Sequence, residues 1–174
     1  MGGLRTHHAH SEVKPMELDE MCKNAVMMAI EREQDLLEFY IQVAPLMKRP
    51  EIQSVFEAFR DDIQMRVGDL QALLAEEEPT CDLIAQELSR EDNPQNLGIS
   101  KYLRDVELKE DSDFQDVLTV AMKRQERVVN FFTQVAAMTP VEEVAGIFRS
   151  IRNEEAGRLR QLEEIYDDEI LLEG

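Results

Sequence analysis

The sequence predicts an all-α protein, a bundle of four long helices with one long crossover between the second and the third. Three observations support this fold. The chain of 174 residues is rich in residues that favour helix and has only seven glycines and six prolines. Four stretches carry apolar residues at helical spacing. The connections between these stretches are short, long and short, so the helices should form two antiparallel pairs.

Composition and charge restrict the classes of function. A hydrophobic share of 43% is enough for the core of one domain. The net charge of −18 would repel a nucleic-acid backbone, so we expect no nucleic-acid partner. No apolar run is long enough to span a membrane, and we find no secretory segment. We therefore expect a cytoplasmic protein whose two cysteines, Cys22 and Cys81, are reduced.

Residues 1–14 are predicted to be a flexible tail, and residues 15–174 a single domain. The tail holds all three histidines, His7, His8 and His10, and has no apolar periodicity. These imidazoles could chelate a divalent metal weakly, but we interpret the stretch as a mobile tail or an expression remnant. The body of the protein has no histidine. A Ser-His-Asp or Cys-His nucleophile is therefore excluded there, and any di-metal centre would have to form without imidazole.

The first helix pair covers about residues 15–78. Its first helix is expected from Pro15 to Leu46, and Pro45 with Pro50 should break the chain after it. Its second helix is expected from Glu51 to Glu77 and should be stopped by Pro79. The positions predicted to face inward are Val26, Ala29, Ile30, Leu37, Tyr40, Ala44, Ile52, Val55, Phe56, Phe59, Ile63, Leu70 and Leu74.

The crossover is predicted over residues 79–113 and the second pair over residues 114–172. The crossover contains a short helical candidate, Cys81 to Ser89, and the turn-rich stretch EDNPQNLG. The third long helix should span Phe114 to Met138. The fourth should begin after Thr139-Pro140, with Thr139 as N-cap and Pro140 as first helical residue. The inward positions are Val117, Leu118, Ala121, Val128, Val129, Phe132, Val135, Ala136, Val144, Phe148, Ile151, Leu159, Leu162 and Tyr166.

An internal repeat relates the two helix pairs. An offset of 92 residues takes residue 29 to residue 121 and aligns the pairs without a gap. The matched positions include Ala29 with Ala121, Arg32 with Arg124, Phe39-Tyr40 with Phe131-Phe132, Phe56 with Phe148, Arg60 with Arg152 and Arg66 with Arg158. Two such pairs related by a pseudo-two-fold axis would bring equivalent positions together at the centre. Chance similarity between amphipathic helices is the alternative explanation.

Five polar side chains interrupt the apolar stripes. They are Glu33, Arg66, Gln125, Glu155 and Arg158. A charge in a helical core is costly unless it is paired or bound to an ion. Under the repeat, Glu33 corresponds to Gln125, Ile63 to Glu155, and Arg66 to Arg158. These positions should therefore lie at one level of the bundle.

Three stretches of the chain resemble a known family. They are AIEREQDLLEFY at residues 29–40, KYLRDVELKEDSDFQDVLTVAMKRQE at 101–126 and EEAGRLRQLEEIYDDEIL at 154–171. The chain resembles the rubrerythrin-like branch of the ferritin-like, di-iron carboxylate superfamily over about residues 18–173. The resemblance implies a ferritin-like four-helix bundle. In that family each helix pair supplies one Glu, seven residues before an aromatic, and one Glu-x-x-His, and the six side chains hold two irons.

The resemblance implies a degenerate metal site. The family's ligand positions fall on Glu33, Ile63, Arg66, Gln125, Glu155 and Arg158. Only two of them keep a carboxylate, too few donors for two irons. We therefore expect no metal and no cofactor, and two arginines that neutralise two glutamates. The two arginines could alternatively bind a small anion. Asp62 and Glu154, beside the inward positions, are expected to be solvated unless a helix tilt brings either one into the cluster.

These departures predict a non-catalytic helical module. The chain lacks the paired C-x-x-C motifs of a rubredoxin module, so no built-in electron donor is present. The alternative is an iron-binding oxidoreductase, acting in peroxide reduction or iron handling, with an atypical di-iron site. Because rubrerythrin-like domains are often dimeric, we also expect a homodimer. The sequence does not specify a protein partner.

Overall fold

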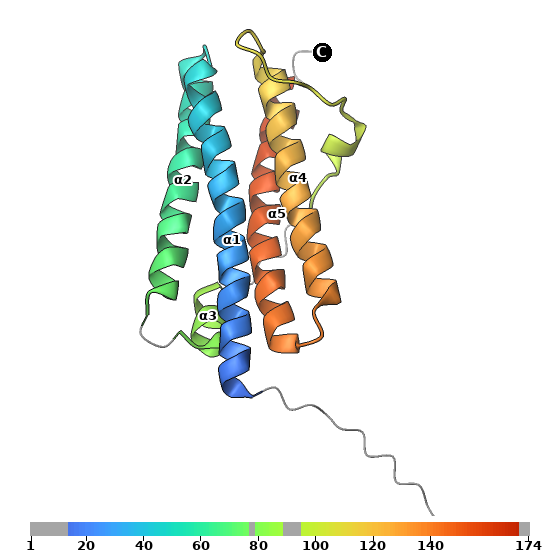
Figure 1. Cartoon of the computed structure of the whole chain (residues 1–174). Coiled ribbons are helices and arrows are strands. Elements are labelled where there is room, and N and C mark those ends of the chain that lie inside the picture. The colour runs from blue at the N-terminus through green and yellow to red at the C-terminus, as the bar shows by residue number, and fades with distance from the viewer. Residues whose placement is uncertain (1–13, 77–78, 89–94, 171–174) are drawn as a thin grey trace, which may run out of the picture.

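The computed structural model of the chain is all-helical over the residues that the structure describes, which are 14–76, 79–88 and 95–170. Four long helices run alongside one another (Figure 1). They are α1 (Pro15–Val43), α2 (Pro50–Leu74), α4 (Phe114–Met138) and α5 (Glu142–Ile170), and the connections hold α3 (Cys81–Leu88) and two 3-10 turns, η1 (Ala44–Leu46) and η2 (Ile99–Tyr102). These ranges contain no strand. The predicted all-α class is confirmed.

The long helices form two antiparallel pairs. α1 packs along α2, and α4 packs along α5, with the chain reversing direction within each pair (Figure 1). α1 also contacts α5 and α4 and so joins the two pairs, whereas α2 packs chiefly against α1. Each position predicted to face inward is buried or half-buried. None of the described helices has an apolar stretch of the length that a membrane crossing requires.

Helix boundaries follow local chemistry, with one correction. α2 begins at Pro50, and Asp113 caps α4 by accepting a hydrogen bond from the Asp116 backbone N–H at 2.9 Å. The prediction that Thr139-Pro140 starts the last helix is wrong. Thr139 instead closes α4, because its hydroxyl donates to the carbonyl of Val135 at 2.6 Å, and α5 begins only at Glu142.

Aromatic packing repeats between the two helix pairs. The rings of Phe39 and Tyr40 have centroids 5.1 Å apart, and the equivalent rings of Phe131 and Phe132 are also 5.1 Å apart. Both pairs meet edge to face. Tyr40 then packs on Phe56 at 5.8 Å, as Phe132 packs on Phe148 at 6.2 Å. The 92-residue offset therefore relates positions whose rings pack in the same way.

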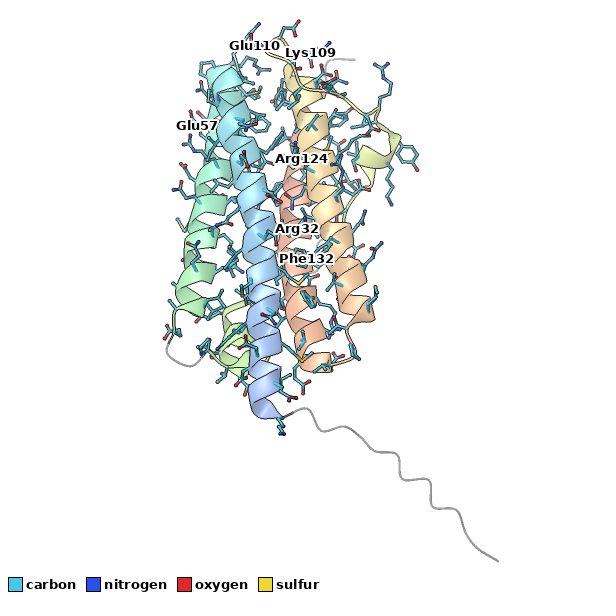
Figure 2. All side chains as sticks on the ribbon, viewed as in Figure 1. Arg32, Glu57, Lys109, Glu110, Arg124 and Phe132 are labelled. Carbon is cyan, nitrogen blue, oxygen red and sulfur yellow. A yellow bond between two sulfur atoms is a disulfide. The ribbon has the colours of Figure 1, made fainter. Side chains whose placement is uncertain are left out.

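Two cation–π contacts cross between the pairs. The Arg32 guanidinium of α1 lies 4.4 Å from the ring centroid of Phe131 on α4, and Arg124 of α4 lies 4.7 Å from that of Phe39 on α1. Figure 2 labels both arginines, Arg32 on α1 and Arg124 on α4. Each contact is the counterpart of the other under the repeat. This reciprocity is what a pseudo-two-fold relation between the pairs requires.

A buried carboxylate fixes the later part of the crossover on α5. Glu163 is 1% exposed and accepts hydrogen bonds from the Leu97 backbone N–H at 2.8 Å and from Asn96 Nδ2 at 3.2 Å. Asn96 Nδ2 also donates to the carbonyl of Ala156 at 2.9 Å. Further along, Lys123 Nζ donates to the carbonyl of Leu103 at 2.6 Å, which holds the chain against α4.

Cys22 and Cys81 form a disulfide, so the prediction of reduced cysteines is wrong. The bond joins α1 to the first residue of α3, with Cα atoms 5.5 Å apart. Asp19 reinforces this junction by accepting a hydrogen bond from the Cys81 backbone N–H at 2.9 Å. The residues are 59 positions apart in sequence, and only the return of α3 to α1 brings them together. The predicted cytoplasmic location loses the argument that rested on reduced thiols.

Some predicted features lie outside the described residues. These are residues 1–13 of the tail, Glu77, residues 89–94 of the crossover and residues 171–174.

The disulfide should contribute substantially to stability. A bond closing 59 residues is expected to stabilise the fold by about 4 kcal/mol, because it restricts the unfolded chain. We expect Cys22→Ala/Cys81→Ala, or wild type in dithiothreitol, to unfold at a clearly lower urea concentration. Wild type without reductant should show no free thiol on denaturation. Two free thiols in that assay, or an unchanged urea midpoint on reduction, would contradict the disulfide.

Candidate functional site

A layer of polar side chains separates two apolar clusters of the core. Glu33 on α1, Gln125 on α4 and Glu155 on α5 lie in this layer and are 2%, 0% and 1% exposed. One cluster contains Leu36, Tyr40, Phe56, Leu118 and Leu162, and the other contains Val26, Ile84, Phe132, Ile147 and Ile151. The layer coincides with the level at which the sequence predicted the polar positions to meet.

Arg158 lies between the two buried glutamates. Its Nη1 donates to both carboxylate oxygens of Glu33 at 3.2 Å and to Glu155 Oε2 at 3.0 Å. Arg158 follows Glu155 by three residues, so the two share one face of α5. The Arg158 side chain is 10% exposed. One guanidinium therefore supplies the positive charge that both carboxylates need in the core.

Gln125 completes the contacts of Glu155. Its Nε2 donates to Glu155 Oε2 and to the backbone carbonyl of Glu155, the latter at 3.1 Å. An amide can donate these bonds, whereas an ionised carboxylate at the same position could only accept. Within the described part of the chain, Gln125 Oε1 and the hydroxyl of Tyr40 are buried without a hydrogen-bond partner.

Arg66 makes a different contact from the one predicted. Its Nη2 donates to Glu154 Oε2 at 2.5 Å, which joins α2 to α5 beside the cluster rather than within it. The expectation that Glu154 is solvated is wrong, because its residue is only 8% exposed, whereas Asp62 is exposed as predicted. The reason is that α5 turns Glu154 toward α2. Ile63 is fully buried in the apolar core.

Burial shifts the pKa of two groups in this region. Arg66 forms an ion pair with Glu154, and Arg158 forms ion pairs with Glu33 and Glu155. Burial raises the pKa of Glu33 above its ordinary value of 4.5, and the nearby positive charge of Arg158 only partly opposes this shift. Burial also raises the pKa of the Tyr40 hydroxyl, which keeps the group protonated.

The residues present do not fit a di-iron centre. Both retained carboxylates are hydrogen-bonded to Arg158, and the position of Ile63 offers no donor atom. Iron requires several anionic or imidazole ligands on each ion. Among residues 14–76, 79–88 and 95–170, no three His, Cys, Asp or Glu side chains gather in an arrangement that could hold a metal ion.

A polar pocket lies beside the cluster, between α2 and α5. It has a volume of about 440 Å³, and its lining includes Arg66 and Arg158 but also the carboxylates of Asp62, Asp69 and Glu154. Both arginines already bind carboxylates of the chain itself. The balance of charge therefore disfavours the small anion considered from the sequence.

This chain matches no protein-family model, and neither a curated protein nor a solved structure is significantly similar to it. The resemblance to rubrerythrin-like proteins therefore stays a prediction. The functional argument depends on the geometry of the polar layer and of the surface beside it.

The sequence left the burial of Glu154 open and missed that of Glu163. Glu154 precedes the recognised position Glu155, and its burial depends on how far α5 is rotated, which the sequence does not fix. Glu163 did carry a signal, since it lies four residues after Leu159 and three before Tyr166, where the helical period points inward. Its partner is a backbone N–H of the crossover, at Leu97, and only the folded chain brings it there.

Removal of the shared cation should destabilise the fold strongly. We expect Arg158→Ala to lower the free energy of unfolding by about 3 to 5 kcal/mol, because it leaves two buried carboxylates without their counter-charge. The matched control is Arg160→Ala on the same helix, whose surface pair with Glu164 should contribute less than about 1 kcal/mol. Urea denaturation measures both, and equal losses would show that the buried cluster has no special role.

The raised pKa of Glu33 predicts a pH dependence. The stability that protonated Glu33 provides is fully present below its unfolded pKa and is lost as the pH rises through the raised, folded value. Glu33→Gln cannot ionise and lacks this dependence. We therefore expect the stability of wild type, relative to Glu33→Gln, to increase as the pH falls from neutral toward the ordinary pKa of 4.5. Urea titrations across this range test it, and a relative stability that decreases would contradict the direction of the shift.

Proposed function

We propose that this chain is a ferritin-like four-helix bundle whose di-iron centre has been replaced by a Glu/Arg ion-pair cluster, and that it acts as a non-catalytic helical module. The observation that supports this most directly is the position of Arg158. Its guanidinium donates to Glu33 and to Glu155, the two carboxylates at the family's ligand positions.

The arrangement of the helices supports the ferritin-like part of the proposal. The connections of α1 with α2 and of α4 with α5 are short, and the connection of the two pairs is long. One long crossover in the middle of four helices is typical of ferritin-like folds. The reciprocal contacts of Arg32 with Phe131 and of Arg124 with Phe39 are consistent with a duplicated helix pair.

The energetics of burial support the replacement of the metals. Carboxylates that once bound iron must be neutralised in another way when the iron is lost, because an uncompensated charge in a core is costly. Arginine provides a permanent positive charge and several donors without any cofactor. Arg158 meets this requirement for Glu33 and Glu155, and Arg66 meets it for Glu154.

The chemistry of the cluster supports the absence of catalysis. Glu33 and Glu155 both accept hydrogen bonds from Arg158, so neither is held in an open position against a substrate. Homodimerisation stays a prediction, which light scattering over a range of protein concentrations would test.

Restoring the ligand positions should create iron affinity. We expect the variant Ile63→Glu/Gln125→Glu/Arg66→His/Arg158→His to bind iron and wild type to bind none, because the substitutions add four donors at the six family positions. Residues 1–13 are removed from both proteins so that the three tail imidazoles do not contribute. Metal analysis after iron loading gives the result. Two irons per wild-type chain would refute the proposal and favour the iron-binding oxidoreductase.

A further inference from the structure

A groove runs along the outer flank of α2. The helix packs chiefly against α1, and its other side faces α5 and α3 across two adjoining pockets of about 440 and 370 Å³. Both pockets are lined by Arg66 and Asp69, so they form one continuous depression. α3 lies near the end of α2 at which the chain leaves it (Figure 1). We call this depression the acidic groove.

The exposed charged side chains of the acidic groove that form no salt bridge are acidic. Asp62, Asp69 and Glu76 line it at intervals of seven residues, and all three are exposed. Seven residues are about two helical turns, so Asp62 and Asp69 lie about 10 Å apart on one side of α2. None of the three forms a salt bridge within the described ranges. The groove's two arginines are already bound, Arg66 to Glu154 and Arg158 to Glu33 and Glu155.

Apolar side chains lie between these carboxylates. Met65 is 68% exposed and, with Phe59, lines the pocket between α2 and α5. Leu73, Leu83 and Leu88 line the pocket between α2 and α3. Methionine adapts its shape to different partners. Apolar side chains in the lining of a polar groove, with acidic side chains at two-turn spacing, are the complement of a helix that has an apolar stripe flanked by cations.

We propose that the acidic groove binds a basic amphipathic helix of a partner protein. The partner's apolar stripe packs on Met65 and the leucines, and its Lys or Arg side chains pair with Asp62, Asp69 and Glu76. Charge decides against a second copy of this chain as occupant, because each copy carries a net charge of −18. The inference goes beyond the loss of the metal site and does not depend on it, so iron binding would refute that proposal and leave this one standing.

The test uses the full chain and a fluorescein-labelled helical peptide of about 18 residues, about 27 Å long, with a leucine stripe flanked by lysines. Fluorescence anisotropy measures its Kd. We expect Asp62→Asn/Asp69→Asn/Glu76→Gln to weaken binding about tenfold, because three ion pairs are lost together. The matched control is Glu31→Gln/Asp35→Asn/Glu38→Gln, which removes the same charge from exposed positions of α1. It should change Kd by less than about twofold.

Four results would overturn the inference. Equal weakening by the control variant would show that the peptide responds only to the overall charge. Equal binding of a scrambled peptide of the same composition would show that no helical stripe is recognised. Unchanged affinity in Met65→Ser would mean that the groove takes any polycation rather than an amphipathic helix. A wild-type dimer that the groove substitutions dissociate would identify the occupant as a second copy.

Discussion

The fold depends on one requirement, that the carboxylates of Glu33 and Glu155 have a positive charge beside them in the core. Arg158 provides it, with its Nη1 within 3.2 Å of both. The same contact ties α1 to α5, and Gln125 adds α4 by donating to Glu155. Three of the four long helices are therefore held at one level by Arg158 together with Gln125. Since unpaired charges in a core cost several kcal/mol, this layer also restricts how the helices can slide or rotate.

The internal repeat holds for the aromatic packing of the two helix pairs but not for the charged residues of the polar layer. The aromatic pairs and the crossed contacts of Arg32 and Arg124 are equivalent in the two halves. At the polar layer, Glu33 corresponds to Gln125 and Ile63 to Glu155, so each half has a glutamate where the other half has an uncharged residue. The equivalent arginines also differ, since Arg158 binds inside the layer and Arg66 binds Glu154 at its edge. A symmetric backbone thus carries an asymmetric set of charges.

The inside and the outside of the molecule use their charges in opposite ways. In the polar layer every guanidinium is engaged by carboxylates of the chain itself, which leaves little for a ligand. Along the acidic groove, Asp62, Asp69 and Glu76 are exposed and form no salt bridge in the described ranges. The groove that α2 forms with α5 and α3 is therefore the surface that we propose for new contacts. A function located on this surface is consistent with the proposed replacement of the metal site by an ion-pair cluster.

The sequence by itself determined the all-α class, the positions of the four long helices and the polar residues of the core, because helical periodicity decides which side chains face inward. Through the repeat it also predicted that Glu33, Arg66, Gln125, Glu155 and Arg158 lie at one level, and in the structure Arg66 binds beside the other four. Only the tertiary structure decided that Arg66 binds Glu154, since this depends on the rotation of α5 relative to α2. The disulfide of Cys22 with Cys81 and the burial of Glu163 under the crossover were likewise decided there. Both arise where a connection folds back on a helix, and the path of a connection leaves no periodic signal in the sequence.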